Sequence, residues 1–238
     1  MISLSTLLYR AVAWVLAALV SAGLPVRLRG GDVTVTAHSG SLGLADNSIE
    51  AMQAGVQVGA QIVEFDLNFT TEGDPVLSHD APQSDQSYVP LSDVFQFLRE
   101  NKSILANVDV KSTQYLEKLL PLAEEYGVTE QLFMTGLDEN SISIAKEKCP
   151  GIPYYLNVSV DKDTDLPSLI EKAQALGAIG LNLYWKGASR RLVRLCHRSG
   201  LLVSVWTVND LRPILEMTLI GADNVTTRRP DLACAVIR

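Results

Sequence analysis

The sequence predicts an α/β fold, a single (β/α)8 TIM barrel with an extra apolar helix at its N-terminus. Two observations lead to this prediction. From residue 33 onward, eight short apolar runs rich in β-branched residues alternate with eight longer amphipathic stretches, and parallel strands buried on both faces have such a composition. No linker or low-complexity tract interrupts the alternation. Strict alternation over 238 residues favours one closed barrel as one domain.

The boundaries of the elements follow from these runs and from their flanking residues. The predicted strands are residues 33–37, 62–67, 104–110, 132–135, 153–157, 179–183, 202–207 and 224–226. The predicted helices are residues 48–58, 91–100, 113–126, 139–148, 166–176, 189–198, 210–219 and 230–236. Asn47 is expected to cap the first helix, with Glu50 three residues later. A tight turn at residues 71–74 would lead into a short returning strand that carries His79 over the strand ends.

Residues 1–30 form a separate apolar segment ahead of the barrel domain of residues 31–238. Arg10 is the only charged residue between positions 4 and 26, and the apolar run 11–24 is shorter than the roughly 20 residues that cross a bilayer. Three interpretations stay open. The segment is a helix that plugs the bottom of the barrel, an anchor lying on a membrane, or a cleaved signal. The location is accordingly cytoplasmic or membrane-associated.

The composition restricts the partners. A formal charge of -7 disfavours nucleic acid, because a phosphate backbone is bound by concentrated positive charge. A small anionic substrate remains compatible, since a metal or local cations can dominate one pocket. The three cysteines show no metal-ligand spacing and are expected to be small buried residues.

Acidic residues stand where barrel enzymes carry their sites, near the C-terminal ends of the strands. Glu64 and Asp66 are two positions apart on one predicted strand, so their side chains point to the same side. Asp109 lies in the next strand of the barrel. Carboxylates in apolar strands repel one another and lose hydration, and a divalent cation removes both penalties. Three oxygen ligands suit Mg²⁺ or Ca²⁺ better than zinc.

Histidine and lysine side chains accompany these acids. His38 follows the first strand, His79 follows the returning strand, and Lys111 follows Asp109. A metal, a lysine and two histidines can neutralise a phosphodiester and move protons at its attacking and leaving oxygens. His197 lies late in a predicted helix, where a structural role is expected.

Seven short motifs are spread over residues 33–232. They are Ala37-His38-Ser39-Gly40, Asp46-Asn47-Ser48-Ile49-Glu50-Ala51, residues 59–67, residues 71–80, Val108-Asp109-Val110-Lys111, residues 205–209 and residues 221–231. Together they resemble the motifs of the glycerophosphodiester phosphodiesterase family. Each motif is short, but their combined order and spacing are specific.

The resemblance implies a phosphoric diester hydrolase that uses Mg²⁺ or Ca²⁺ and converts a glycerophosphodiester to glycerol 3-phosphate and an alcohol. In this family a neighbouring hydroxyl of the substrate is thought to attack first, and water then opens the cyclic phosphate. The implied roles are acid and base for His38 and His79, phosphate contact for Lys111, metal ligation for Glu64, Asp66 and Asp109, and substrate binding for Ser39, Asp46, Asn47 and Trp206.

Three departures from the family pattern leave the substrate open. Ser39 replaces an arginine, Asp46 and Asp109 are shorter than the family's acids, and the segment 81–88 is shorter than the usual insertion. The short segment 81–88 and the Asp-x-Lys motif at residues 109–111 also make the chain similar to spider-venom-type sphingomyelinase D. The alternatives are therefore a phospholipase D-like enzyme acting on lysophospholipids, a non-catalytic phosphodiester-binding barrel, and a metal-dependent aldolase or isomerase.

One predicted helix is strongly basic. Arg190, Arg194 and Arg198 recur every four residues and therefore share one face. Such a face is expected to be solvated, and attraction to anionic lipid is the alternative, which would fit an anchoring N-terminus.

Overall fold

The computed structural model describes residues 4–22 and 33–237. The strands are β1 Thr34–Ala37, β2 Ile62–Phe69, β3 Pro75–Leu77, β4 Leu105–Val110, β5 Leu132–Thr135, β6 Tyr155–Val158, β7 Gly180–Tyr184, β8 Leu202–Trp206 and β9 Asn224–Thr227. The helices are α1 Leu4–Ser21, α2 Ile49–Gln57, α3 Leu91–Glu100, α4 Leu119–Tyr126, α5 Glu139–Lys148, α6 Leu166–Leu176, α7 Arg190–Arg198, α8 Leu211–Ile220 and α9 Pro230–Ile237. The predicted boundary at residues 30 and 31, and positions 23–26 of the apolar segment, lie outside the described residues.

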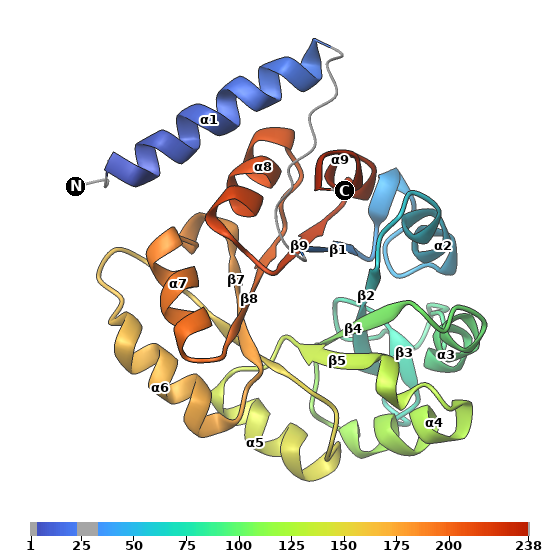
Figure 1. Cartoon of the computed structure of the whole chain (residues 1–238). Coiled ribbons are helices and arrows are strands. Elements are labelled where there is room, and N and C mark those ends of the chain that lie inside the picture. The colour runs from blue at the N-terminus through green and yellow to red at the C-terminus, as the bar shows by residue number, and fades with distance from the viewer. Residues whose placement is uncertain (1–3, 23–32, 238) are drawn as a thin grey trace.

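Eight parallel strands form a barrel with helices around it (Figure 1). The strand order is β5-β4-β2-β1-β9-β8-β7-β6, so the first strand of the barrel lies between β2 and the last strand. A bridge between Met134 and Tyr154 joins the two ends of this path. β3 is the predicted returning strand and pairs antiparallel with β2. The TIM barrel predicted from the alternation is thereby confirmed.

The two faces of β2 explain how the barrel holds its acids. All eight residues of β2 are buried. Val63, Phe65 and Leu67 join the hydrophobic core under the helices, whereas Glu64 and Asp66 line a pocket in the barrel. This follows from the alternation of side chains along a strand. Near the C-terminal ends of the strands, polar side chains line the interior of the barrel. In many TIM barrels, branched apolar residues fill the interior.

The start of α2 differs from the sequence prediction. The capping residue is Ser48, whose hydroxyl accepts a hydrogen bond from the Ala51 amide at 3.2 Å, and not Asn47. Asn47 has a left-handed φ of 59°, and its side chain is hydrogen-bonded to Asp66. Both residues are good helix caps, so the choice between them depends on the tertiary contact with Asp66.

The helix predicted for residues 113–126 also begins later than expected. A 3-10 turn at Leu116–Lys118 precedes α4, and Tyr115 before it adopts a left-handed φ of 62°. The remaining segment, residues 111–115, is a loop at the pocket that begins with Lys111.

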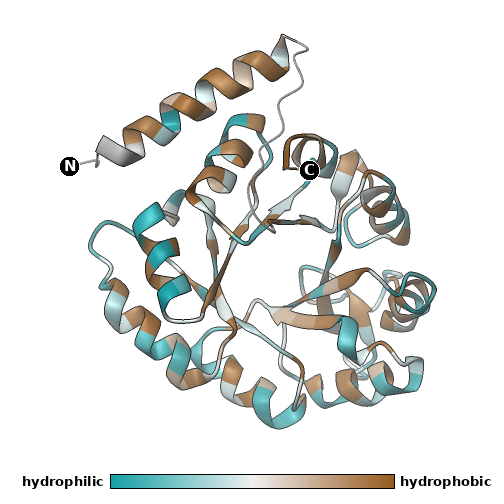
Figure 2. Ribbon diagram, in the orientation of Figure 1, coloured by the Kyte–Doolittle hydropathy of each residue, from teal (hydrophilic) through white to brown (hydrophobic). Residues whose placement is uncertain are grey.

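α1 packs against α8 on the outside of the ring of helices, and not across the bottom of the barrel (Figure 1). Ala13 is fully buried in this contact, and Arg10 pairs with Glu216 at 3.0 Å. The opposite side of α1 is apolar and exposed, as Figure 2 shows by its colour. Among the described residues, none of the helices has the length and apolar character that spanning a membrane requires.

Candidate active site

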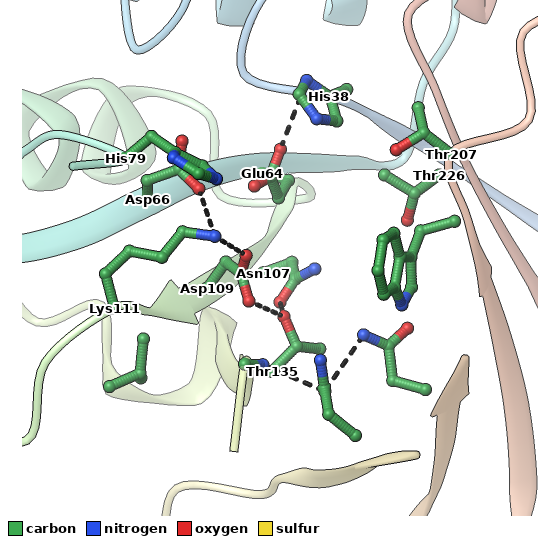
Figure 3. Close-up of a pocket in the computed structure, with 15 residues that line it drawn as sticks. His38, Glu64, Asp66, His79, Asn107, Asp109, Lys111, Thr135, Thr207 and Thr226 are labelled. Carbon is green, nitrogen blue, oxygen red and sulfur yellow. Dashed lines mark hydrogen bonds and ion pairs between the residues drawn. The ribbon is translucent and has the colours of Figure 1, made fainter. Parts of the chain in front are cut away.

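The pocket lies at the C-terminal ends of the strands and has a volume of about 420 Å³ (Figure 3). Seven residues singled out from the sequence line it: His38, Glu64, Asp66, His79, Asp109, Lys111 and Trp206. Ser39 and Asn47 lie behind the lining and are hydrogen-bonded to the lining residues Glu64 and Asp66. Asp46 is bonded to Arg228, which does not line the pocket. The structure thus brings together in one place residues that are spread over most of the sequence.

Three carboxylates form an acidic cluster, which we define as Glu64, Asp66 and Asp109. Each offers an oxygen atom within 4.8 Å of the others. The parallel register of β2 and β4 places Asp66 directly beside Asp109. Burial, together with the charges of Asp66 and Asp109, raises the pKa of Glu64 well above its usual value. Mutual repulsion and lost hydration are the penalties that a bound cation would relieve.

Lys111 is already attached to this cluster. Its ammonium lies 3.0 Å from Asp66 Oδ1 and 2.5 Å from Asp109 Oδ2. Burial alone would lower the pKa of Lys111, but the two carboxylates outweigh it and raise that pKa above its ordinary value. Lys111 therefore remains a permanent positive charge at the pocket.

His38 is held at the end of β1 by the backbone and by its neighbours. Its ring Nδ1 is 3.2 Å from the Ser39 hydroxyl and 3.9 Å from Glu64 Oε2. The Ser39 amide donates a hydrogen bond of 2.7 Å to the same Glu64 oxygen. Burial and the positive charge of Arg228 lower the pKa of His38, and nearby carboxylates only partly offset them. Near neutral pH the ring is therefore mostly uncharged.

His79 differs from His38 in its exposure. Its side chain is 71% exposed, and its Nδ1 lies 2.9 Å from Asp80 Oδ1. The loop that carries it is fixed by Asn68 and Ser78, which both donate hydrogen bonds to the carbonyl oxygen of Asp80. The returning strand β3 thus brings a histidine to the pocket, as the sequence predicted.

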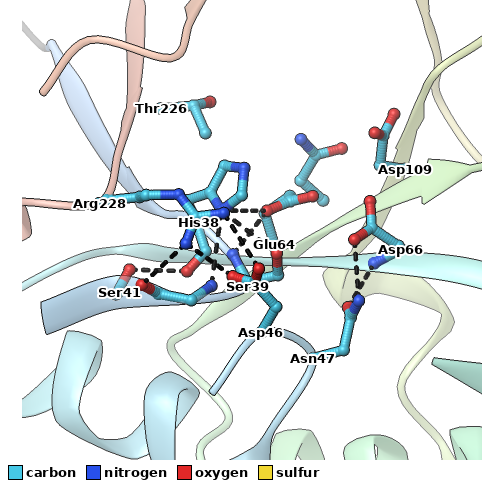
Figure 4. A network of polar contacts seen from close by, with 12 residues as sticks. His38, Ser39, Ser41, Asp46, Asn47, Glu64, Asp66, Asp109, Thr226 and Arg228 are labelled. Atoms are coloured by element: carbon cyan, nitrogen blue, oxygen red, sulfur yellow. Dashed lines mark hydrogen bonds and ion pairs between the residues drawn. The ribbon is translucent and has the colours of Figure 1, made fainter. Parts of the chain in front are cut away.

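Asn47 and Asp46 are hydrogen-bonded to other residues of the protein and do not line the pocket. The Asn47 amide donates to Asp66 Oδ2 at 2.8 Å, and its carbonyl accepts from the Asp66 backbone at 3.0 Å. Asp46 forms two hydrogen bonds, of 2.7 and 3.2 Å, with the guanidinium of Arg228 (Figure 4). A side chain at Gly40 would collide with this pair, since its Cβ would lie 1.7 Å from Asp46 Oδ1.

Arg228 is a site residue that the sequence reasoning missed. It follows β9, yet it contacts the loop after β1 through Asp46 and the carbonyl oxygen of Gly40, and it places a positive charge near His38. Its only sequence signal is its place in the closing motif, one position before Arg229 and Pro230.

Six further polar residues of the pocket were also missed, namely Asn107, Thr135, Asn157, Asn182, Thr207 and Thr226. The Thr135 hydroxyl is hydrogen-bonded to Asn107 at 2.8 Å and to Asp109 at 3.0 Å. Polar residues within predicted strands were the one available signal. His197, by contrast, is paired with Asp223 at 2.8 Å and does not line the pocket.

The acidic cluster fits a divalent cation such as Mg²⁺ or Ca²⁺. Its donor atoms are all carboxylate oxygens, they converge within 4.8 Å, and the pKa of Glu64 shows the cost of leaving them together. Hard oxygen donors of this kind are those that these two ions prefer. Glu64, Asp66 and Asp109 are therefore the residues that could hold the metal.

Fold and pocket together define an α/β barrel that carries a cluster of charged residues at the C-terminal ends of its strands. The sequence model described as the glycerophosphoryl diester phosphodiesterase family matches residues 29–85 and 90–232. The chain belongs to this family. The resemblance found in the motifs, and the expectation of a phosphoric diester hydrolase, are thereby confirmed.

Two curated relatives have similar sequences over nearly their whole length. A glycerophosphodiester phosphodiesterase of Caldanaerobacter subterraneus subsp. tengcongensis is 22% identical over 241 residues, covering 86% of this chain and 97% of the relative. A glycerophosphodiester phosphodiesterase of Bacillus altitudinis is 20% identical, covering 85% of this chain and 97% of the relative.

Solved structures share the fold. A putative glycerophosphoryl diester phosphodiesterase of Silicibacter pomeroyi superposes with a TM-score of 0.77 at 17% identity, covering 87% of this chain and 93% of the other. An Oleispira antarctica phosphodiesterase, solved in complex with the product sn-glycerol-3-phosphate, superposes with a TM-score of 0.66 at 22% identity, covering 84% and 94% of the two chains.

Proposed function

We propose that this protein hydrolyses a glycerophosphodiester to glycerol 3-phosphate and an alcohol. The observation that carries the proposal is the convergence of the acidic cluster, Lys111, His38 and His79 in one pocket of about 420 Å³. The acidic cluster would hold the cation and Lys111 would contact the phosphate. The two histidines would transfer protons. These groups can supply the charge neutralisation and the proton transfers that speed the cleavage of a phosphodiester.

Each group has a distinct task in the proposed reaction. A bound divalent cation supplies charge neutralisation on the non-bridging oxygens of the phosphate. Lys111, which is held beside Asp66 and Asp109, would add a second positive charge to stabilise the phosphate. His38, uncharged near neutral pH because of its lowered pKa, can accept a proton from the attacking oxygen, which is the neighbouring hydroxyl of a glycerophosphodiester or a water molecule. Water also opens the cyclic phosphate that attack by the neighbouring hydroxyl would form. His79 can donate a proton to the leaving oxygen from its exposed position beside Asp80.

A neighbouring cavity favours a hydrated part of the substrate, and not an acyl chain, beside His79 and Lys111. This second cavity shares His79 and Lys111 with the pocket, and its other lining includes Asn68, Thr70 and Gln114. Such polar residues suit a hydrated head group better than an acyl chain. The Oleispira structure holds sn-glycerol-3-phosphate, the product class that we propose for this enzyme.

Turnover of glycerophosphocholine and of bis-p-nitrophenyl phosphate tests the proposal. Both should be hydrolysed, EDTA should abolish both activities, and either Mg²⁺ or Ca²⁺ should restore them. Glu64→Gln should abolish activity at any metal concentration, while the exposed Glu100→Gln on α3 should behave as wild type. A Glu64→Gln enzyme with full metal-dependent activity would rule out this ligand set, and a wild type inactive on both diesters would favour the non-catalytic barrel.

We also propose that α1 attaches the protein to an anionic membrane surface. Its outer side exposes Leu8 and Val15. Two cations border this side, since Arg190 stacks over the ring of Tyr9 at 4.4 Å and Arg212 over that of Trp14 at 4.7 Å. A helix with exposed apolar residues flanked by arginine is suited to the interface of an anionic bilayer.

Sedimentation with lipid vesicles tests this attachment. Wild type should sediment with phosphatidylcholine vesicles that contain phosphatidylglycerol, and much less with phosphatidylcholine alone. Val15→Asp should prevent sedimentation, whereas Leu105→Asp, at an exposed apolar residue of β4, should not. Self-association that Val15→Asp abolishes, without any vesicle binding, would show that α1 contacts a second copy of the chain.

A further inference from the structure

Asn47 uses both ends of its side-chain amide on one acid of the acidic cluster (Figure 4). Its Nδ2 donates a hydrogen bond of 2.8 Å to Asp66 Oδ2, and its Oδ1 accepts one of 3.0 Å from the backbone amide of Asp66. A backbone N–H can only donate, so the oxygen of Asn47 must face it and the nitrogen must face the carboxylate. The two bonds together fix the Asp66 carboxylate relative to its own main chain.

The main chain of Asn47 is held separately from its side chain. Its backbone amide donates a hydrogen bond of 3.1 Å to the carbonyl oxygen of Ser39. Its φ of 59° is left-handed, a conformation that asparagine adopts more readily than most residues with a Cβ atom. The contact with Asp66 can therefore be removed by a residue that keeps this backbone.

The same loop also holds the other acid of β2. The Ser39 amide donates a hydrogen bond of 2.7 Å to Glu64 Oε2, while the Ser39 carbonyl accepts the hydrogen bond from Asn47. The loop between β1 and α2, residues 38–48, thus contacts both carboxylates that β2 contributes to the acidic cluster.

These contacts leave room for a cation at Asp66. Its Oδ1 lies 3.0 Å from the Lys111 ammonium, and its Oδ2 accepts from Asn47. An ionised carboxylate has about four lone-pair sites, so each oxygen keeps one for a metal. Because Asp66 is only 4% exposed, protein groups rather than bulk water determine its orientation.

We propose that Asn47 is a positioning residue for the divalent cation, which acts through Asp66 and does not contact the substrate. Asp66 lines the pocket, whereas Asn47 lies behind it. This role differs from the substrate binding that the family resemblance implies for Asn47. The inference rests on the metal site of the proposed function. Groups that hydrogen-bond to a metal ligand fix its orientation and commonly tune the metal affinity.

Calorimetry with Ca²⁺ tests the role of Asn47. Asn47→Gly tolerates the left-handed φ and removes both hydrogen bonds to Asp66. It should raise the Kd for Ca²⁺ by ~10- to 100-fold, the usual effect of losing such a partner. At saturating metal, kcat for glycerophosphocholine should fall much less, because excess cation refills the site. Leu42→Gly is the matched control, since Leu42 lies in the same loop with the same φ of 59° and does not line the pocket. It should bind Ca²⁺ as wild type does.

A merely structural role predicts a different result. Asn47→Gly would then lower the melting temperature in EDTA, while the folded protein would bind Ca²⁺ as tightly as wild type. An unchanged Kd for Ca²⁺ with a raised KM for glycerophosphocholine would restore the substrate-binding role, and either result would overturn the proposal. In an Asp66→Ala background, Asn47→Gly should change the Ca²⁺ affinity little, because the group that it positions is already gone.

The measurement of metal affinity needs no substrate and so separates this inference from the proposed function. A wild type that binds Ca²⁺ but hydrolyses neither diester would contradict the proposed function alone. A wild type that binds neither Ca²⁺ nor Mg²⁺ would overturn the metal site, and this inference with it.

Discussion

The two sides of the pocket differ in the charge of their side chains and in how completely those side chains are paired. On β2 and β4 every charged group is paired: Asp66 and Asp109 both contact Lys111, and Glu64 accepts from the Ser39 amide. On β6 and β7 the groups are neutral, and Asn182 Oδ1 is left without a partner among the described residues. The acids of the charged side could hold a divalent cation. We therefore expect substitutions on the charged side to have the largest effects on turnover.

The largest expected effect after loss of a metal ligand concerns Lys111. Lys111→Met removes a preorganised positive charge, which should lower kcat by about 10²-fold or more on every diester. Steady-state kinetics with glycerophosphocholine and bis-p-nitrophenyl phosphate measures it. Lys172→Met, which breaks only the exposed ion pair with Glu139, is the control. If kcat stayed normal and only KM rose, Lys111 would contribute substrate binding and no transition-state stabilisation.

A smaller effect is expected at the edge of the charged side. Arg228→Met removes both hydrogen bonds to Asp46 and the one to Gly40 that fix the loop after His38. Because the pair is partly exposed, we expect a loss of about ten-fold in kcat/KM, with no preference between substrates. Arg229→Met, which breaks the neighbouring surface pair with Asp231, should have little effect.

A double variant separates the two possible roles of Arg228. If Arg228 acts through Asp46, the change Asp46→Asn should cost little more once Arg228 is already methionine. Additive losses would instead indicate that Arg228 contacts the substrate directly.

The smallest effect is a dependence of stability on pH. The folded protein raises the pKa of Glu64 above its ordinary value of 4.5, so the folded state binds this proton more tightly than the unfolded state. With EDTA present, the resulting stability is complete below that value and is lost as the pH rises through the folded-state pKa. Within this window the melting temperature should fall by roughly 3–5 °C per pH unit. Glu64→Gln should remove the fall, and wild type melting in the same way as Glu64→Gln would contradict it.

The sequence predicted the charged side of the pocket and not the neutral side. Glu64, Asp66 and Asp109 are carboxylates in apolar strands, and His38 and His79 belong to recognisable motifs, so chemistry and spacing both identified them. Asn157 and Asn182 are single amides in strands, and the hydrogen bonds that tie them together and to Gly136 form only in the folded barrel. The barrel itself was predictable because its alternation of strands and helices is a local pattern.

Contacts between distant segments account for the errors. Asn47 and Ser48 are equally good caps by residue type, and only the hydrogen bond from Asn47 to Asp66 decides between them. Arg228 was missed for the same reason, because its partners lie at the other end of the barrel sequence. Propensity depends on the local sequence, whereas tertiary contacts determine which residue caps the helix and which residues Arg228 contacts.

The pairing of β1 with β9 has a consequence for the folding of the enzyme during its synthesis. The backbone amide of His38 donates a hydrogen bond of 3.0 Å to the carbonyl oxygen of Thr227, and Thr226 lines the pocket. The proposed base is thus anchored to β9, which is translated after the other strands that the structure describes. Until β9 leaves the exit tunnel of the ribosome, the growing chain contains the acidic cluster, His38 and His79, but the site is not assembled. Catalysis can begin only after β9 has been made and has paired with β1.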